Sequence, residues 1–127
     1  MHLLARIWVL TGAALTLGLG ILYALSPASV ESAAGIQLPT AAALTEIRST
    51  YGGLHIGFGL FLVACSMTPT GRPFGLLLCA LAFSFAGVMR IWGVAQFGSG
   101  LPQLATSALE LGFSGGAFLL WRRTQAA

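Results

Sequence analysis

Apolar residues fill four long runs of the chain, separated by shorter stretches rich in proline, glycine and small polar residues. Each run reaches about the 20 residues that a helix needs to cross the hydrocarbon core of a bilayer. Strand-like alternation of apolar and polar positions is absent from these runs, and a helix satisfies all of its own backbone groups in lipid. The pattern predicts transmembrane helices at about residues 4–25, 41–67, 74–97 and 102–122.

The connection between the first two runs, residues 26–40, is the only long one. Its small residues and lone Glu31 predict a loop or a short interfacial helix. Thr40 precedes the second run, where its hydroxyl can cap a helix N-terminus. The other connections, residues 67–73 and 97–102, are short and rich in proline and glycine, and they make neighbouring helices antiparallel. The sequence therefore predicts an all-α membrane protein, a four-transmembrane-helix up-down bundle.

Composition agrees with a membrane environment. Hydrophobic residues make up 57% of the 127 residues and charged residues 7%, against about 25% charged residues in a soluble domain. This length has room for one domain, so we expect a single integral membrane domain over residues 1–127. The net charge of +3 is small and dispersed, which argues against nucleic acid as a partner. The partners that we expect are membrane lipids, with a homo-oligomer or a larger membrane complex as further possibilities.

The arginines indicate the orientation, because positively charged residues concentrate in cytoplasmic loops. Arg6 lies at the N-terminal end, Arg72 in the second connection, and Arg122 and Arg123 at the C-terminal end. In a four-span topology these positions share one side. We therefore expect a multi-pass protein of the bacterial cytoplasmic (inner) membrane with cytoplasmic N- and C-termini. The first run is longer than the roughly 7–15 apolar residues of a signal peptide, so we expect it to be retained.

The second run contains a group of polar side chains in the stretch TEIRSTYGGLHIG. Ionisable residues inside a membrane are costly and often functional. On an ideal helix, with about 100° between residues, Arg48 and His55 share one face and Tyr51 lies at its margin. Glu46 lies on the opposite face. Because side chains two residues apart do not face each other, we do not expect Glu46 and Arg48 to pair.

Two glycines of the same run predict a close helix contact. Gly53-x-x-x-Gly57 is a small-residue motif at which the backbone of another helix can approach. The first run offers a matching set of small residues, Gly12, Thr16 and Gly20. We therefore expect Gly53 and Gly57 to pack against the first helix.

The fourth run carries a polar stripe, which in a bundle faces inward and away from lipid. The third run contributes Arg90, about two turns before its end. The two arginines and two glutamates of the last three runs sum to zero charge and can neutralise one another. We expect Arg48, Arg90 and Glu110 to converge in one cavity in the outer half of the membrane. The polar stripe consists of Gln103, Thr106, Ser107, Glu110, Ser114 and Ala117.

His55 has three interpretations: a hydrogen-bonded core residue, a proton-transfer group, or an axial haem or metal ligand. Gly52 and Gly59 supply the small residues that a haem slot needs, but no second ligand is evident. Cys65 and Cys79 are interpreted as small apolar packing residues, since no further metal ligand lies near them in the sequence. We expect no cofactor, with haem through His55 as the alternative, and no metal site.

A signature of the form E-x-R-x-x-Y-G-G occupies residues 46–53, and His55 lies outside it. Further positions of the same pattern are Gly57, Gly59, Gly71, Arg72, Arg90 and Glu110. In these positions the chain resembles a family of small bacterial membrane proteins catalogued as a domain of unknown function. The resemblance covers the chain from about the second helix to the end. It implies four helices and a membrane location, but no particular activity.

Three functions agree with these features. The first is a binding or accessory protein that holds a lipid or small amphiphile at an outward-facing Arg/Glu pocket, because the planar arginine fork grips carboxylate or phosphate. The second is a small membrane enzyme, an acid/base isomerase or hydrolase of a lipophilic substrate. The third is proton-coupled transport by an oligomer. Since no known catalytic motif is present, we favour binding. The candidate ligand-binding residues are Arg48, Arg90, Glu110, Glu46, Tyr51 and His55.

Overall fold

The computed structural model describes residues 2–98 and 100–126, and at Ala33 and Ala34 the backbone alone. These residues are mainly helical, and no strand occurs among them. Four helical segments of this part are long and apolar enough to cross a membrane, as the sequence predicts. Their length and composition make the chain a multi-pass membrane protein. The spans are His2–Leu25, Ala41–Met67, Arg72–Phe97 and Leu101–Gln125.

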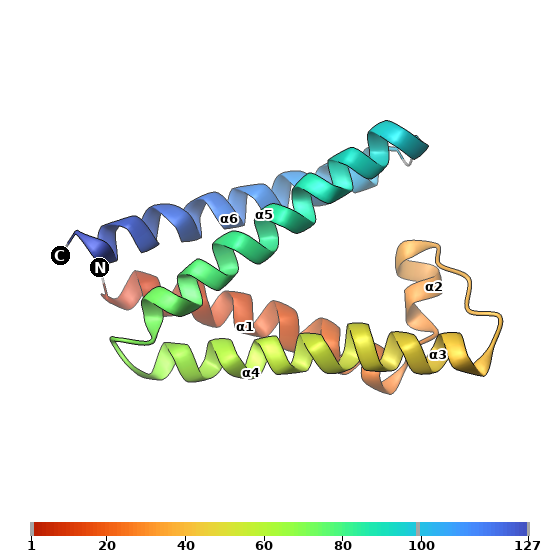
Figure 1. Cartoon of the computed structure of the whole chain (residues 1–127), viewed down its shortest axis with the longest axis horizontal. Helices are drawn as coiled ribbons and strands as arrows, with labels where there is room; N and C mark the ends of the chain where they lie inside the picture. The colour runs from red at the N-terminus through yellow and green to blue at the C-terminus, as the bar shows by residue number, and fades with distance from the viewer. Residues whose placement is uncertain (1, 99, 127) are drawn as a thin grey trace. The chain divides into compact units, whose positions relative to one another are not determined.

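Figure 1 shows the helical elements in chain order. The second span is divided into three of them, because a π-helical segment interrupts its α-helical hydrogen bonding. A short helix also forms in the long first connection, one of the two forms predicted for it, and its position at a membrane interface stays a prediction. The elements are α1 (His2–Leu25), α2 (Ser29–Ala34), α3 (Ala41–Ile47), η1 (Arg48–Gly53), α4 (Leu54–Met67), α5 (Arg72–Phe97) and α6 (Leu101–Gln125).

Local signals determine two helix ends. The side-chain oxygen of Thr40 accepts a hydrogen bond from the backbone N–H of Ala43 at 3.1 Å, which confirms the predicted N-cap of α3. After α5, Gly98 adopts a left-handed conformation with φ 69°, and its N–H donates to the carbonyl of Val94. Glycine reaches this conformation without the steric cost of a Cβ, so the helix ends there.

The chain forms two compact units. The first contains Met1–Val9 and Cys65–Ala127, and therefore α5, α6, the N-terminal end of α1 and the C-terminal end of α4. The second contains Leu10–Ala64, and therefore α2, α3, η1 and most of α1 and α4. A single membrane domain over residues 1–127 stays a prediction.

In the first unit, α5 and α6 lie side by side and antiparallel (Figure 1). Gly87 allows a close approach, since a Cβ added there would lie 2.8 Å from the Cγ of Leu111. The predicted inward stripe of α6 is confirmed at its buried members, Ser107, Ser114 and Ala117. The prediction is wrong for Thr106, which is exposed and whose hydroxyl donates to the carbonyl of Pro102 in the same helix at 3.0 Å.

The N-terminal end of α1 and the C-terminal end of α4 complete the first unit. The ring of Trp8 stacks on Phe113 of α6 at a centroid distance of 5.2 Å, and its indole N–H donates to the Phe113 carbonyl at 3.1 Å. Cys65 and Cys79 are both buried and free, as expected of packing residues. A Cβ on Gly75 of α5 would lie 3.0 Å from the Cβ of Cys65, so α4 and α5 meet closely beside their connection.

In the second unit, α1 and α4 are antiparallel neighbours joined through small residues (Figure 1). A Cβ on Gly20 would lie 2.7 Å from the backbone nitrogen of Ile56, and one on Gly52 would lie 2.9 Å from that of Ala24. Gly59 likewise faces the side chain of Leu17. These contacts follow one face of the second span, and every one of them needs a short side chain on at least one helix.

The prediction that Gly53 and Gly57 face the first helix is wrong. Both glycines are exposed, and within the described residues a Cβ added to either meets no atom within 4 Å. The second span offers two glycine pairs on different faces, and α1 packs against Gly52 and Gly59. A spacing of four between small residues permits a close contact but does not select the face that makes it.

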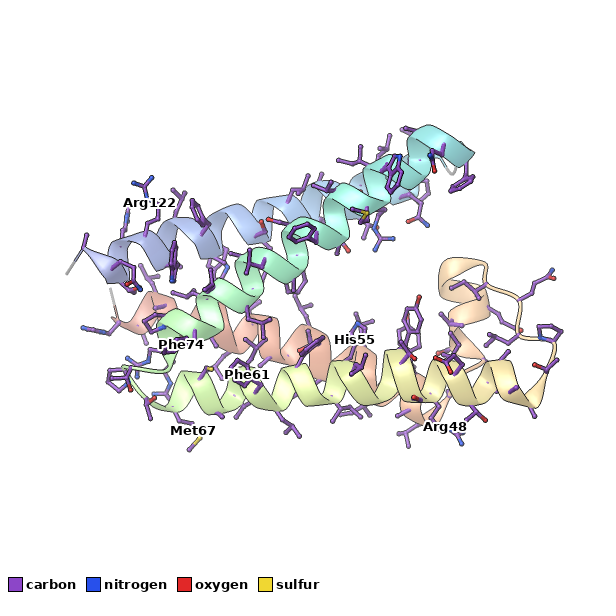
Figure 2. All side chains as sticks on the ribbon, viewed as in Figure 1. Arg48, His55, Phe61, Met67, Phe74 and Arg122 are labelled. Carbon is purple, nitrogen blue, oxygen red and sulfur yellow. The ribbon has the colours of Figure 1, made fainter. Side chains whose placement is uncertain are left out.

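The π-helical segment η1 changes the alignment of side chains along the second span. The N–H of Leu54 donates to the carbonyl of Ser49, five residues earlier, in place of the α-helical partner four residues earlier. One extra residue in a turn rotates everything before it by about 100° relative to everything after it. Arg48 and His55 therefore do not share a face as an ideal helix would require. Figure 2 shows their side chains leaving the helix on different sides.

Candidate functional site

Among the described residues, the most extensive set of polar side-chain contacts lies between α5 and α6 and consists of Arg90, Gln103 and Glu110, here called the Arg90 group. The guanidinium of Arg90 donates from Nε to Oε2 of Glu110 at 3.1 Å and from Nη2 to Oε1 of Glu110 at 2.8 Å. Its Nη1 donates to Oε1 of Gln103 at 2.6 Å. The carboxylate thus engages one edge of the guanidinium with two parallel hydrogen bonds, which are among the stronger contacts in proteins.

Two neighbouring serines of α6 form further hydrogen bonds beside the Arg90 group. Ser107, one turn after Gln103, is buried, and its hydroxyl donates to the Gln103 carbonyl at 3.0 Å. One turn beyond Glu110, the hydroxyls of Ser84 and Ser114 are 2.5 Å apart and connect the two helices again. Successive side-chain contacts at spacings of three and four residues keep α5 and α6 in one register.

The Arg90 group keeps unused hydrogen-bonding capacity. A guanidinium has five N–H donors, and three of those of Arg90 have acceptors among the described residues. The side chain of Arg90 remains 34% exposed, and that of Glu110 15% exposed. Arg90 lies about 10 Å along the axis from the Phe97 end of α5. The unused donors can therefore reach a ligand that approaches from that end of the helix pair.

A second polar group lies within the second unit. The rings of Tyr51 and His55 stack at a centroid distance of 6.1 Å, one helical turn apart. Tyr23 of α1 meets Tyr51 edge to face at 6.0 Å. Among the described residues, Nδ1 of His55 is a buried side-chain atom without a hydrogen-bond partner. Sequence reasoning missed Tyr23. Its place beside Ala24, on the small-residue face of α1, was the available signal.

The two charged residues at the start of the second span, Glu46 and Arg48, form no side-chain hydrogen bond or ion pair with another helix within the described part of the chain. The hydroxyl of Thr50 donates to Oε1 of Glu46 at 2.7 Å, one turn along the same helix. Arg48 is exposed, and no hydrogen bond or ion pair of its side chain occurs among the described residues. Glu46 and Arg48 do not pair with each other, as the two-residue spacing predicts.

The structure brings together some of the predicted site residues. Arg90 and Glu110 form the expected ion pair, with Gln103 as a third member. Tyr51 and His55 lie together in the other unit, to which Arg48 also belongs. The convergence of Arg48 with Arg90 and Glu110 therefore stays a prediction. Among the described residues, three His, Cys, Asp or Glu side chains do not gather at any point where they could hold a metal ion.

Comparison with known proteins identifies the family. A family model described as "Domain of unknown function (DUF4345)" matches residues 4–121, and therefore includes the first helix as well as the region of the resemblance noted in the sequence. No curated protein and no solved structure matches the chain. The family match covers nearly the whole chain, and the protein belongs to the DUF4345 family of unknown function.

Proposed function

We propose that this protein binds the charged head of a lipid or small amphiphile at the Arg90 group. The observation that supports this proposal is the partial exposure of a guanidinium that keeps two N–H donors without an acceptor among the described residues. A donor removed from water without a partner costs free energy. A phosphate or carboxylate oxygen would satisfy these donors, and the planar arginine fork suits both anions.

The pairing of Arg90 makes it a prepared binding group. Glu110 and Gln103 hold the guanidinium from two directions, so that a ligand would not have to order a free arginine side chain. Ordering a long side chain at an interface costs about 0.5–1.5 kcal/mol, and a side chain that is already ordered avoids this cost. A headgroup would therefore meet donors that already point in fixed directions.

The proposal includes an orientation in the membrane. With Arg6, Arg72, Arg122 and Arg123 in the cytoplasm, the Arg90 group lies in the outer half of a bacterial inner membrane. Single cysteines at Ser32 and Thr124, in a Cys65→Ala, Cys79→Ala background, test this orientation. A membrane-impermeant thiol reagent should label position 32 from outside the cell and position 124 only after lysis. Labelling of both positions from the same side would contradict it.

Native mass spectrometry of the purified protein tests the binding. We expect co-purified lipid on the wild type, and its loss from Arg90→Met. Arg123→Met is the matched control, because it removes an arginine at the C-terminal end that is remote in sequence from the Arg90 group. An equal lipid content in all three proteins would overturn the proposed function.

A further inference from the structure

The Arg90 group has no net charge. The positive charge of Arg90 is balanced by Glu110, and Gln103 is neutral. A headgroup with a net negative charge would gain little from such a group, because the carboxylate lies only 2.8 Å from the guanidinium that attracts it. The charge balance therefore favours a ligand that itself carries both signs.

The Arg90 group also has both unused hydrogen-bond donors and unused acceptors. Two N–H donors of Arg90 are free to meet an anion. A carboxylate can accept about four hydrogen bonds, and that of Glu110 accepts two from Arg90. Donors and acceptors thus remain side by side, on two side chains that are both partly exposed.

We propose that the ligand is a zwitterionic amphiphile with a primary ammonium next to its phosphate, the headgroup chemistry of phosphatidylethanolamine. The phosphate accepts from the free N–H groups of Arg90, and the ammonium donates to the remaining lone pairs of Glu110. This inference rests on the proposed function and specifies its ligand. A quaternary ammonium lacks the N–H donors that Glu110 would accept, and an anionic headgroup leaves the carboxylate facing like charge.

Native mass spectrometry of the full-length protein with dioctanoyl lipids tests the ligand class. Phosphatidylethanolamine, phosphatidylglycerol and phosphatidylcholine are added at equal concentration, and the retained fraction of each is measured. We expect phosphatidylethanolamine to be retained about tenfold more strongly than the other two, the effect of one charge-assisted hydrogen bond.

Glu110→Gln then tests which residue sets the preference. Without the carboxylate the Arg90 group carries a net positive charge, so the preference should change to phosphatidylglycerol. Glu31→Gln, in the first connection, is the matched control and should keep the wild-type preference. If Glu110→Gln does not fold, Gln103→Lys gives the same net charge while the Arg90–Glu110 pair is kept, and the same change of preference is expected. A preference unaffected by added positive charge in a folded variant would overturn the inference.

The outcomes separate this inference from the proposed function. Equal or stronger retention of phosphatidylglycerol by the wild type, lost in Arg90→Met, would overturn the zwitterionic ligand and leave lipid binding in place. Retention of no lipid above the Arg90→Met level would overturn both. Competition by soluble glycerophosphoethanolamine, a phosphate diester with the same headgroup charges, at the same concentration as the lipid would support the headgroup chemistry and assign it to a soluble ligand.

Discussion

The α5–α6 pair and the α1–α4 pair join two apolar helices in different ways. In lipid there is no hydrophobic force between helices, so association depends on packing and on polar contacts. Between α5 and α6 polar side chains meet across the two helices, in the Arg90–Glu110 ion pair and the Ser84–Ser114 hydrogen bond, beside close packing at Gly87. Between α1 and α4 the contact is steric, since a Cβ on Gly20 would collide with the backbone of the opposite helix.

This difference shows that polar residues in similar apolar runs have different roles. Arg90 reaches across to a neighbouring helix and fixes its register. Arg48 does not do so within its own unit, because the π-helical segment has turned it away from the face of His55. The hydrogen bonds between α5 and α6 can be removed one at a time. The close contact between α1 and α4 instead requires glycine, which has no side chain, at the contact positions. The two pairs should therefore respond differently to substitution.

The largest effect is expected for Gly20→Leu. The added Cβ would lie 2.7 Å from the backbone nitrogen of Ile56 and 3.0 Å from the carbonyl oxygen of Gly52. Because backbone atoms cannot move aside as a flexible side chain can, we expect destabilisation by about 3 kcal/mol, at the upper end for overpacking. Thermal unfolding in detergent and the expression level measure it.

Gly57→Leu is the control for this prediction. It places the same side chain in open space, on a face of the second span other than the one that contacts α1. We expect stability within about 1 kcal/mol of the wild type, the scale of helix propensity. An equal loss of stability in both variants would show that the steric explanation of the α1–α4 contact is wrong.

Glu110→Gln comes next in size and tests the polar pair. It leaves the charge of Arg90 uncompensated, which for a fully buried pair costs about 3–5 kcal/mol. Since the Arg90 side chain is 34% exposed, we expect a smaller loss, about 2 kcal/mol. Chemical or thermal unfolding measures this loss of stability.

The double variant Arg90→Met with Glu110→Met should recover part of that stability, because it leaves neither charge alone. A double variant that is less stable than either single methionine variant would show that the polar group contributes more than charge neutralisation. Such a result would place the main stabilisation in the hydrogen bonds that Arg90 donates to Glu110 and Gln103.

Some features could be read from the sequence because one local signal determines them. The lengths of the apolar runs predicted the four spans, and the hydroxyl of Thr40 predicted the start of α3. The polar stripe of α6 predicted the Arg90–Glu110 pair, since polar groups in lipid must turn toward a partner. In each case one arrangement of the helix satisfies the local signal better than the alternatives.

Other features could not be read because two arrangements were nearly equal in the sequence. Gly53-x-x-x-Gly57 and the pair Gly52 and Gly59 both permit close packing, and only the shape of α1 decides between them. The π-helical segment has no residue signature of its own, yet one extra residue per turn rotates Arg48 relative to His55. An ideal helical wheel was therefore correct beyond this segment and wrong across it.

A smaller effect is expected for the serine pair of α5 and α6. Ser84→Ala and Ser114→Ala each remove one side of a hydrogen bond across the helices. A double-mutant cycle should give a coupling of about 0.6 kcal/mol, the average for such bonds in membranes. A coupling near zero would show that each hydroxyl has an equally good partner elsewhere, and that the Arg90 group alone provides the polar contact.

The smallest effect is expected for Arg48→Met, and it tests how far the difference between the two arginines extends. Arg48 is exposed and has no acidic partner among the described residues, so its removal should change stability by less than about 0.5 kcal/mol. Arg90→Met, with its carboxylate partner left unpaired, should cost several times more. Thermal unfolding of both variants under the same detergent conditions makes the comparison. A loss of 2 kcal/mol or more in Arg48→Met, on the scale of a broken ion pair, would mean that Arg48 does have an acidic partner. If that loss then disappeared in a Glu110→Met background, the partner would be Glu110, and the convergence of Arg48 with Arg90 and Glu110 that the sequence predicts would be established.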